Sequence, residues 1–228
     1  MDVARSTDRR PRRLVAVFSS PDSYGLVLLL IVVAYALSAA ITAAWAMSLV
    51  LTVQIATVWV TLRASRARRL ARAITDVILV ISALAAVANL FIDRATLGTG
   101  LLAVLSGLLF LVAPFAIVRH LALRPAVDRE TVLGAVAAYL LVGMFFAFLY
   151  RALGALQPGP FFGSQGEGTF PQDLFFSFTT LTTTGYGNLV PAGNPGQSFA
   201  VLEMLVGQLF LVTAVAKVIS AWQPRQAR

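Results

Sequence analysis

Long apolar stretches alternate along the chain with short polar segments that are rich in arginine. A helix needs about 20 mostly apolar residues to cross a bilayer, and five stretches reach that length. These stretches are residues 23–44, 73–92, 97–118, 132–150 and 197–222. A sixth, 45–62, follows the first without a polar loop. Because the two together would form a helix of roughly 60 Å, about twice the hydrocarbon thickness, we expect two spans joined by a tight turn near residues 43–45.

The arginines support a count of six spans. If the N-terminus is cytoplasmic, every arginine except Arg94 and Arg151 lies in a cytoplasmic segment. Those segments are residues 1–22, 63–72, 119–131 and 223–228. Treating 23–62 as one span would put the basic N-terminal tail on the opposite side from the arginines that follow it, which contradicts the positive-inside rule. The pattern therefore predicts an all-α membrane protein with six transmembrane helices and both termini in the cytoplasm.

The composition excludes several other classes of protein. Hydrophobic residues make up 58% of the 228 residues and charged residues 12%, which is too apolar for a soluble domain of this size. There is no cysteine and one histidine, His120, so disulfides, thiolate metal sites and Ser-His catalysis lack their residues. We therefore expect no enzyme activity and no cofactor. The net charge of +8 lies mostly between apolar stretches, which indicates contact with anionic membrane lipids rather than nucleic acid.

A shorter pattern separates the last two spans. Residues 154–168 are rich in glycine and proline, which predicts an extracellular loop. Pro171 and Asp173 then favour a helix start, the proline by its backbone angle and the aspartate by the helix dipole. The following LFFSFTTLT gives about two and a half turns, too short to cross a membrane. We therefore expect a re-entrant helix whose C-terminal end, with its negative dipole, points toward the bilayer centre.

The re-entrant helix runs directly into Thr183-Thr184-Gly185-Tyr186-Gly187. Gly185 and Gly187 allow backbone angles that a Cβ would obstruct, so successive main-chain carbonyls can point the same way. The Thr183 hydroxyl can add one more oxygen. Carbonyl oxygens hold large monovalent cations, and irregular backbone is tolerated at membrane depth where protein surrounds it. Helix, re-entrant helix, carbonyl loop and helix thus form a self-consistent ion-conducting unit.

The sequence TTLTTTGYGN between two apolar spans resembles the selectivity filter of the tetrameric potassium channels, strongly over residues 170–221 and weakly elsewhere. The resemblance implies that Gly187 lies at the outer mouth, that Tyr186 points into the protein, and that potassium is preferred. It also implies a homotetramer around one axis. The ion sites for K+ would be formed by the main-chain carbonyls of Thr183, Thr184, Gly185 and Tyr186. The Thr183 hydroxyl would lie below these carbonyls.

This chain departs from many relatives behind the filter. Many have an aspartate where Asn188 stands and a tryptophan pair where Phe175 and Phe176 stand. In those relatives the aspartate accepts a hydrogen bond from an indole N–H. Asparagine is uncharged and phenylalanine has no donor, so this brace cannot form here. We expect either that other contacts, through Thr179 and Thr180, hold the filter, or that it inactivates more readily.

Three residues of the last span are candidates for support or gating. Glu203 lies in the outer half, where an ionisable group is functional unless it is paired; the alternative is a buried carboxyl bonded to pore-helix hydroxyls that still supports the filter. Gly207 is either a gating hinge for the inner helices or a close-packing contact. Lys217, near the inner end, is expected to snorkel to the cytoplasmic interface, and would oppose cation flow if it faced the pore.

The chain divides into a basic cytoplasmic tail (1–22), a four-helix transmembrane module (23–124) and a pore domain (125–228). The module resembles a voltage-sensor domain, but 97–118 contains no arginine and Arg119 follows its end, so we expect no arginine voltage sensor. The basic runs between spans are read as topology determinants, the alternative being a switch for a specific lipid or partner. Control is expected from lipid or a separate regulatory subunit.

These observations together predict a potassium-selective channel of the cell membrane. The use of arginine over lysine and the few residues outside the spans indicate a bacterial protein. One alternative is a potassium transporter subunit, although such transporters usually carry four imperfect filter loops in one long chain. Another is a non-conducting membrane assembly subunit whose first four spans bind a partner.

Overall fold

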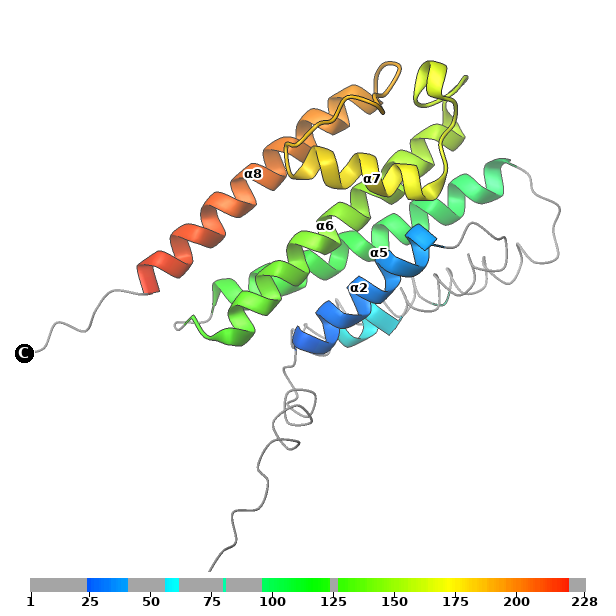
Figure 1. Ribbon diagram of the computed structural model, residues 1–228. Helices are drawn as coiled ribbons and strands as arrows, with labels where there is room; N and C mark the ends of the chain where they lie inside the picture. The colour runs from blue at the N-terminus through cyan, green and yellow to red at the C-terminus, as the bar shows by residue number, and fades with distance from the viewer. Residues whose placement is uncertain (1–23, 41–55, 62–79, 81–95, 124–126, 222–228) are drawn as a thin grey trace, which may run out of the picture.

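The computed structural model describes residues 24–40, 56–61, 80, 96–123 and 127–221. Its longer helices, with one short 3-10 turn, are α2 (Tyr24–Ala40), α5 (Thr96–Ala122), α6 (Arg129–Leu156), η1 (Gly163–Gln165), α7 (Phe170–Leu181) and α8 (Gly196–Ala221). Figure 1 shows α2, α5, α6 and α8 lying lengthwise in one layered bundle, while the short α7 crosses between the ends of α6 and α8. Helices α2 and α6 run in one direction and α5 and α8 in the other.

Two of the described helices, α6 and α8, are long and apolar enough to cross a membrane. The described residues are helical with short connections, as the sequence predicts for a membrane protein of this class. The tail 1–22 and the turn near 43–45 lie outside the described residues, as do all of the predicted span 73–92 except residue 80 and all of the span 45–62 except residues 56–61. The count of six spans therefore stays a prediction.

Helix α6 is longer than the predicted span 132–150 at both ends. It begins at Arg129 because a capping box precedes the apolar pattern: the Thr131 backbone N–H donates to the Asp128 side chain at 2.8 Å, and the Asp128 N–H donates to Thr131 Oγ1 at 3.4 Å. It ends at Leu156, so the first residues of the predicted loop 154–168 are helical. Polar caps and helix ends lie outside an apolar stretch, and hydropathy alone misses them.

The prediction that Arg119 follows the end of its helix was wrong. Helix α5 continues to Ala122, and Arg119 and His120 occupy its last turn. Basic side chains are favoured there because they face the negative end of the helix dipole. Over the length of α5, however, Arg119 remains the one arginine.

Close packing of α6 against α5 and α2 forms the main core. The rings of Phe110 (α5) and Phe148 (α6) stack with centroids 5.6 Å apart. At Gly134 of α6, an added Cβ would lie 3.2 Å from atoms of both Leu121 and Tyr24. The small residue thus lets side chains of α5 and α2 meet over the same point of α6, as small residues do in membrane bundles.

Helix α2 contacts α7 through the Phe178 side chain. The Tyr35 ring of α2 meets the Phe178 ring edge-on, with centroids 5.3 Å apart. On its other side, the Phe178 ring covers Gly143 of α6, where a Cβ would lie 2.8 Å from it. Phe178 therefore joins α2, α6 and α7 at one point, which the sequence did not indicate.

A second aromatic cluster fixes the connection between α6 and α7. Phe161 and Phe162 of the predicted extracellular loop are buried rather than exposed to solvent. The Phe161 ring lies 5.7 Å from Tyr150 of α6, and the Phe162 ring 5.5 Å from Phe176 of α7. The loop is therefore anchored to both helices that it joins.

We expect Tyr35→Ala to destabilise the protein by about 1 kcal/mol, the contribution of an aromatic pair beyond its area burial. The thermal unfolding midpoint of the purified protein in detergent should fall by roughly 2–4 °C. Tyr35→Phe keeps the ring and should match the wild type. Val32, exposed on the same helix, provides the control: Val32→Ala should change the midpoint little. Equal thermal unfolding midpoints for Tyr35→Ala and Val32→Ala would show that the contact between Tyr35 and Phe178 does not stabilise the protein.

Candidate functional site

Helix α7 begins with its own caps and ends at the candidate site. The Thr169 N–H donates to Gln172 Oε1 at 2.7 Å, and Pro171 occupies the first turn, where its missing N–H costs nothing. The Arg151 guanidinium of α6 lies 3.7 Å from the buried Asp173 carboxylate and donates to the Gly168 carbonyl at 3.0 Å. These contacts hold the start of α7 against α6 and direct its C-terminal end, at Leu181, toward α8.

The loop after α7 folds back on the helix through its own backbone. The Thr184 and Gly185 N–H groups both donate to the Thr179 carbonyl, at 2.8 and 3.1 Å, and the Thr183 N–H donates to the Thr180 carbonyl at 2.9 Å. Thr179 and Thr180, which we expected to support the loop, thus contact it through main-chain oxygens. Three consecutive N–H groups of the loop are therefore satisfied by carbonyls of α7.

Backbone angles alternate along Thr183–Gly187. The φ values of Thr183, Gly185 and Gly187 are +58°, +53° and +79°, whereas Thr184 and Tyr186 have negative φ. In an extended strand successive carbonyls point to opposite sides; alternating the sign of φ rotates every second peptide plane and brings them to one side. Positive φ in a β-branched residue costs about 1–3 kcal/mol, so the backbone at Thr183 is strained.

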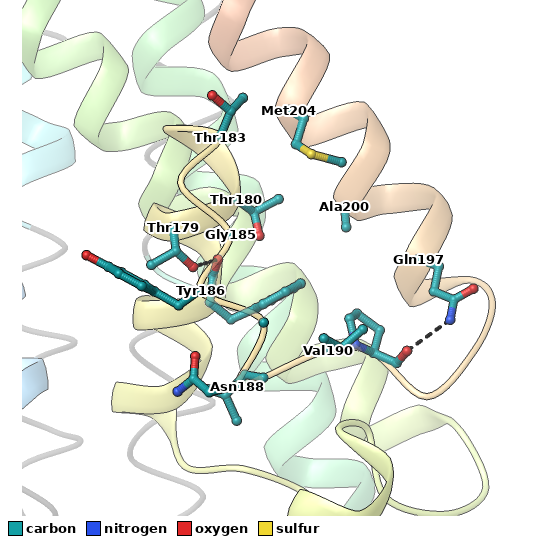
Figure 2. A pocket seen from close by; sticks show the side chains of 14 residues that line it. Thr179, Thr180, Thr183, Gly185, Tyr186, Asn188, Val190, Gln197, Ala200 and Met204 are labelled. Atoms are coloured by element: carbon teal, nitrogen blue, oxygen red, sulfur yellow. Dashed lines mark hydrogen bonds between the residues drawn. The ribbon is translucent and has the colours of Figure 1, made fainter.

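The loop faces outward in the single chain. Residues 182–188 are all exposed, in a chain whose other polar side chains are few. Tyr186 is 71% exposed and extends away from α8 (Figure 2). Its ring stacks on the ring of Phe175, with centroids 5.9 Å apart. Asn188 is exposed, and its side chain has no hydrogen-bond partner within the described residues. A polar loop of this kind needs further protein to cover it at membrane depth.

Helix α8 lies beside the loop and leaves a hollow of about 330 Å³ between them. Figure 2 shows Ala200 and Met204 of α8 on one side of this hollow, with the loop and α7 on the other. Gln197 Nε2 donates to the Pro191 carbonyl at 3.1 Å and ties the start of α8 to the segment that follows the loop. The described residues contain no group of three or more His, Cys, Asp or Glu that could hold a metal ion.

Glu203 is fully buried where α6, α7 and α8 meet. Its carboxyl oxygens lie 2.6 Å from Ser177 Oγ of α7 and 2.6 Å from the Tyr150 hydroxyl of α6. The sequence indicated a contact with pore-helix hydroxyls but identified neither Ser177 nor Tyr150. Because the buried face of α7 also contains Asp173 and Thr180, the sequence carries no signal that singles out Ser177.

Gly207 packs against the end of α7. A Cβ at this position would overlap the Leu181 carbonyl oxygen and lie 3.0 Å from Leu181 Cδ1. The Tyr139 hydroxyl of α6 donates to the same carbonyl at 3.2 Å. The structure therefore provides the close-packing contact that the sequence allowed, and the role of Gly207 as a gating hinge stays a prediction.

Lys217 points toward α5. Its ammonium group donates to the Leu121 carbonyl in the last turn of α5, where a cation meets the negative end of the helix dipole. Whether Lys217 also reaches the cytoplasmic interface, as the sequence predicts, stays a prediction. The contact with Leu121 links the inner end of α8 to the helix that precedes the pore domain.

A family of ion channels matches residues 134–223, which include α7, the loop and α8. An inward rectifier potassium channel, Kirbac3.1 of Paramagnetospirillum magnetotacticum, is 35% identical over 78 residues, 34% of this chain and 25% of the relative. Human potassium channel subfamily K member 1 is 35% identical over 86 residues, 35% of this chain and 26% of the relative.

A human voltage-gated delayed rectifier potassium channel is 32% identical over 65 residues, 28% of this chain and 7% of that protein. Over this region the chain is similar to an ion channel family and to potassium channels. It spans about a quarter of the length of two of these potassium channels and far less of the third. No solved structure matches the chain.

Replacing Gly207 by alanine tests whether this residue serves as a close-packing contact or as a gating hinge. If close packing dominates, Gly207→Ala forces α8 away from Leu181, and overpacking of about 1–3 kcal/mol outweighs the gain of about 1 kcal/mol in helix propensity. We expect a lower thermal midpoint of the purified protein. Gly193→Ala is the matched control, because nothing lies within 4 Å of a Cβ there. A raised midpoint for Gly207→Ala would contradict close packing and favour the hinge.

Proposed function

We propose that the protein is a potassium-selective channel that conducts K+ passively through a filter of main-chain carbonyls. The observation that carries the proposal is the alternating sign of φ over residues 183–187, directly after a re-entrant helix. The similarity of residues 134–223 to an ion channel family, and of part of the chain to potassium channels, supports it. The backbone hydrogen bonds also support it, because three N–H groups of the loop donate to carbonyls of α7, which leaves the carbonyls of the loop available as ligands.

In the proposed filter, neutral carbonyl dipoles replace the water around K+. The ligands are the carbonyls of residues 183–186, with the Thr183 hydroxyl as an additional oxygen at the lower end. Positive φ at Thr183 and Gly185 turns these oxygens to one side. The C-terminal end of α7 contributes the negative end of its dipole, which lowers the cost of a cation inside the membrane. Tyr186 and Phe175 brace the loop by stacking.

The channel is proposed to be a homotetramer. One loop presents oxygens on one side of an ion, so a complete coordination shell needs several copies around an axis. The exposure of residues 182–188 in the single chain and the largely exposed apolar surface of α8 fit such an assembly, since neighbouring copies and lipid would cover both.

The rest of the chain is proposed to complete a six-span membrane protein with cytoplasmic termini and a four-helix module before the pore. The opposite directions of α2 and α5 are consistent with an even number of crossings between them. The one arginine of α5, Arg119, lies in its last turn, and sensing of voltage by this helix would need several arginines within the membrane. We therefore propose that the module does not act as an arginine voltage sensor.

A flux assay on purified protein in liposomes tests the proposed function. We expect K+ flux that is blocked by barium, and a reversal potential that follows the K+ gradient rather than the Na+ gradient. Gly185→Ala places a Cβ at φ +53°, at a cost of about 1–2 kcal/mol in each copy, and should lower the flux by at least roughly tenfold. Gly193→Ala makes the same chemical change outside the loop and should conduct as the wild type.

Two outcomes would overturn the channel. Wild-type liposomes without K+ flux would favour a non-conducting assembly subunit. Flux that requires a second coupled solute or another subunit would favour a transporter subunit. Flux without preference for K+ over Na+, or equal flux in Gly185→Ala and Gly193→Ala, would show that the loop is not the selective element.

A further inference from the structure

Two short contacts meet at one hydroxyl behind the candidate filter. Ser177 Oγ lies 2.7 Å from the Gly143 carbonyl oxygen and 2.6 Å from Glu203 Oε1. The other carboxyl oxygen, Glu203 Oε2, lies 2.6 Å from the Tyr150 hydroxyl. Ser177, Tyr150 and Glu203 are each fully buried, so no water competes for these positions. The contacts join α6, α7 and α8.

The number of hydrogens decides how these bonds are made. A serine hydroxyl has one hydrogen, and a backbone carbonyl can only accept. The 2.7 Å contact with Gly143 therefore takes the hydrogen of Ser177. An ionised Glu203 would then face the Ser177 oxygen lone pair to lone pair at 2.6 Å, which is repulsive. A hydrogen on Glu203 Oε1 makes the same contact a short O–H···O bond.

We propose that Glu203 is held as a neutral carboxylic acid, with its proton on Oε1, and acts as a positioning residue for the filter. The Tyr150 hydroxyl donates to Glu203 Oε2, the Glu203 carboxyl donates to Ser177 Oγ, and the Ser177 hydroxyl donates to the Gly143 carbonyl. Each hydrogen in this series of hydrogen bonds therefore has an acceptor. Within the described residues no arginine or lysine pairs with Glu203. An isolated buried carboxylate is strongly disfavoured, whereas a protonated carboxyl with both oxygens bonded is not.

The proton on Glu203 links α8 to the part of α7 that holds the loop. Ser177 lies two residues before Thr179, whose carbonyl accepts from the Thr184 and Gly185 N–H groups. Fixing Ser177 against α6 and α8 therefore sets the depth and rotation of α7, and with it the position of the loop backbone. This consequence rests on the proposed potassium channel, while the location of the proton does not.

Infrared difference spectroscopy on the reconstituted protein tests the proton directly. The wild type minus Glu203→Gln spectrum at neutral pH should contain the C=O stretch of a protonated carboxylic acid. Glu167, an exposed glutamate of the connecting loop, provides the control: wild type minus Glu167→Gln should contain carboxylate bands instead. Carboxylate bands assigned to Glu203 would overturn the proposal, whether or not the protein conducts.

Ion selectivity tests the positioning role. Glutamine can donate its N–H to Ser177 and accept from Tyr150, so Glu203→Gln should retain the K+ over Na+ permeability ratio. Glu203→Ala removes the link and should reduce that ratio by roughly tenfold or more, even where its thermal midpoint equals that of the wild type. A ratio in Glu203→Gln as low as in Glu203→Ala would contradict the neutral acid. A wild type without K+ selectivity would instead refute the proposed function and leave the infrared result standing.

Discussion

Main-chain carbonyls can replace the water around a cation only if they are held in one direction before the ion arrives. Carbonyls of an ordinary loop turn toward whatever donor is near, because each backbone oxygen requires a partner. In this protein the loop after α7 gives its N–H groups to Thr179 and Thr180, and alternates the sign of φ through Gly187. In the proposed filter, both features would leave the oxygens aligned on one side.

Three sets of contacts hold α7, one with α6 and α2 and two with α8. Phe178 packs between Gly143 of α6 and Tyr35 of α2. The Leu181 carbonyl meets Gly207 of α8, and Ser177 meets Glu203. Through the contact of Tyr35 with Phe178, a change in the position of α2 can reach α7 directly, and with it the proposed filter. Lys217 forms a second connection, between α8 and the end of α5, at the opposite end of the pore domain.

Local rules predicted the parts of the site that depend on neighbouring residues in sequence. The short α7, its start near Pro171 and the long apolar α6 and α8 follow from helix capping and span length. Glycines at alternate positions indicated the unusual backbone of the loop, but positive φ at Thr183 could not be expected, because threonine disfavours it.

Contacts between distant residues were not predictable in the same way. Glu203 pairs with Tyr150 and Ser177, which lie 53 and 26 residues away, and no periodicity relates such positions. The extension of α5 through Arg119 was missed because polar residues at a helix end resemble a loop in a hydropathy pattern. The proposed fourfold assembly depends on surfaces between copies, which one chain indicates only by what it leaves exposed.

An electron cryo-microscopy map of the full-length protein, purified in potassium, tests the central claim most directly. The account predicts four chains around one axis, with the carbonyls of residues 183–186 lining it and ion density between successive oxygen layers. A map in which these residues lie away from any symmetry axis, or in which the oxygens of the loop point into the protein, would contradict it.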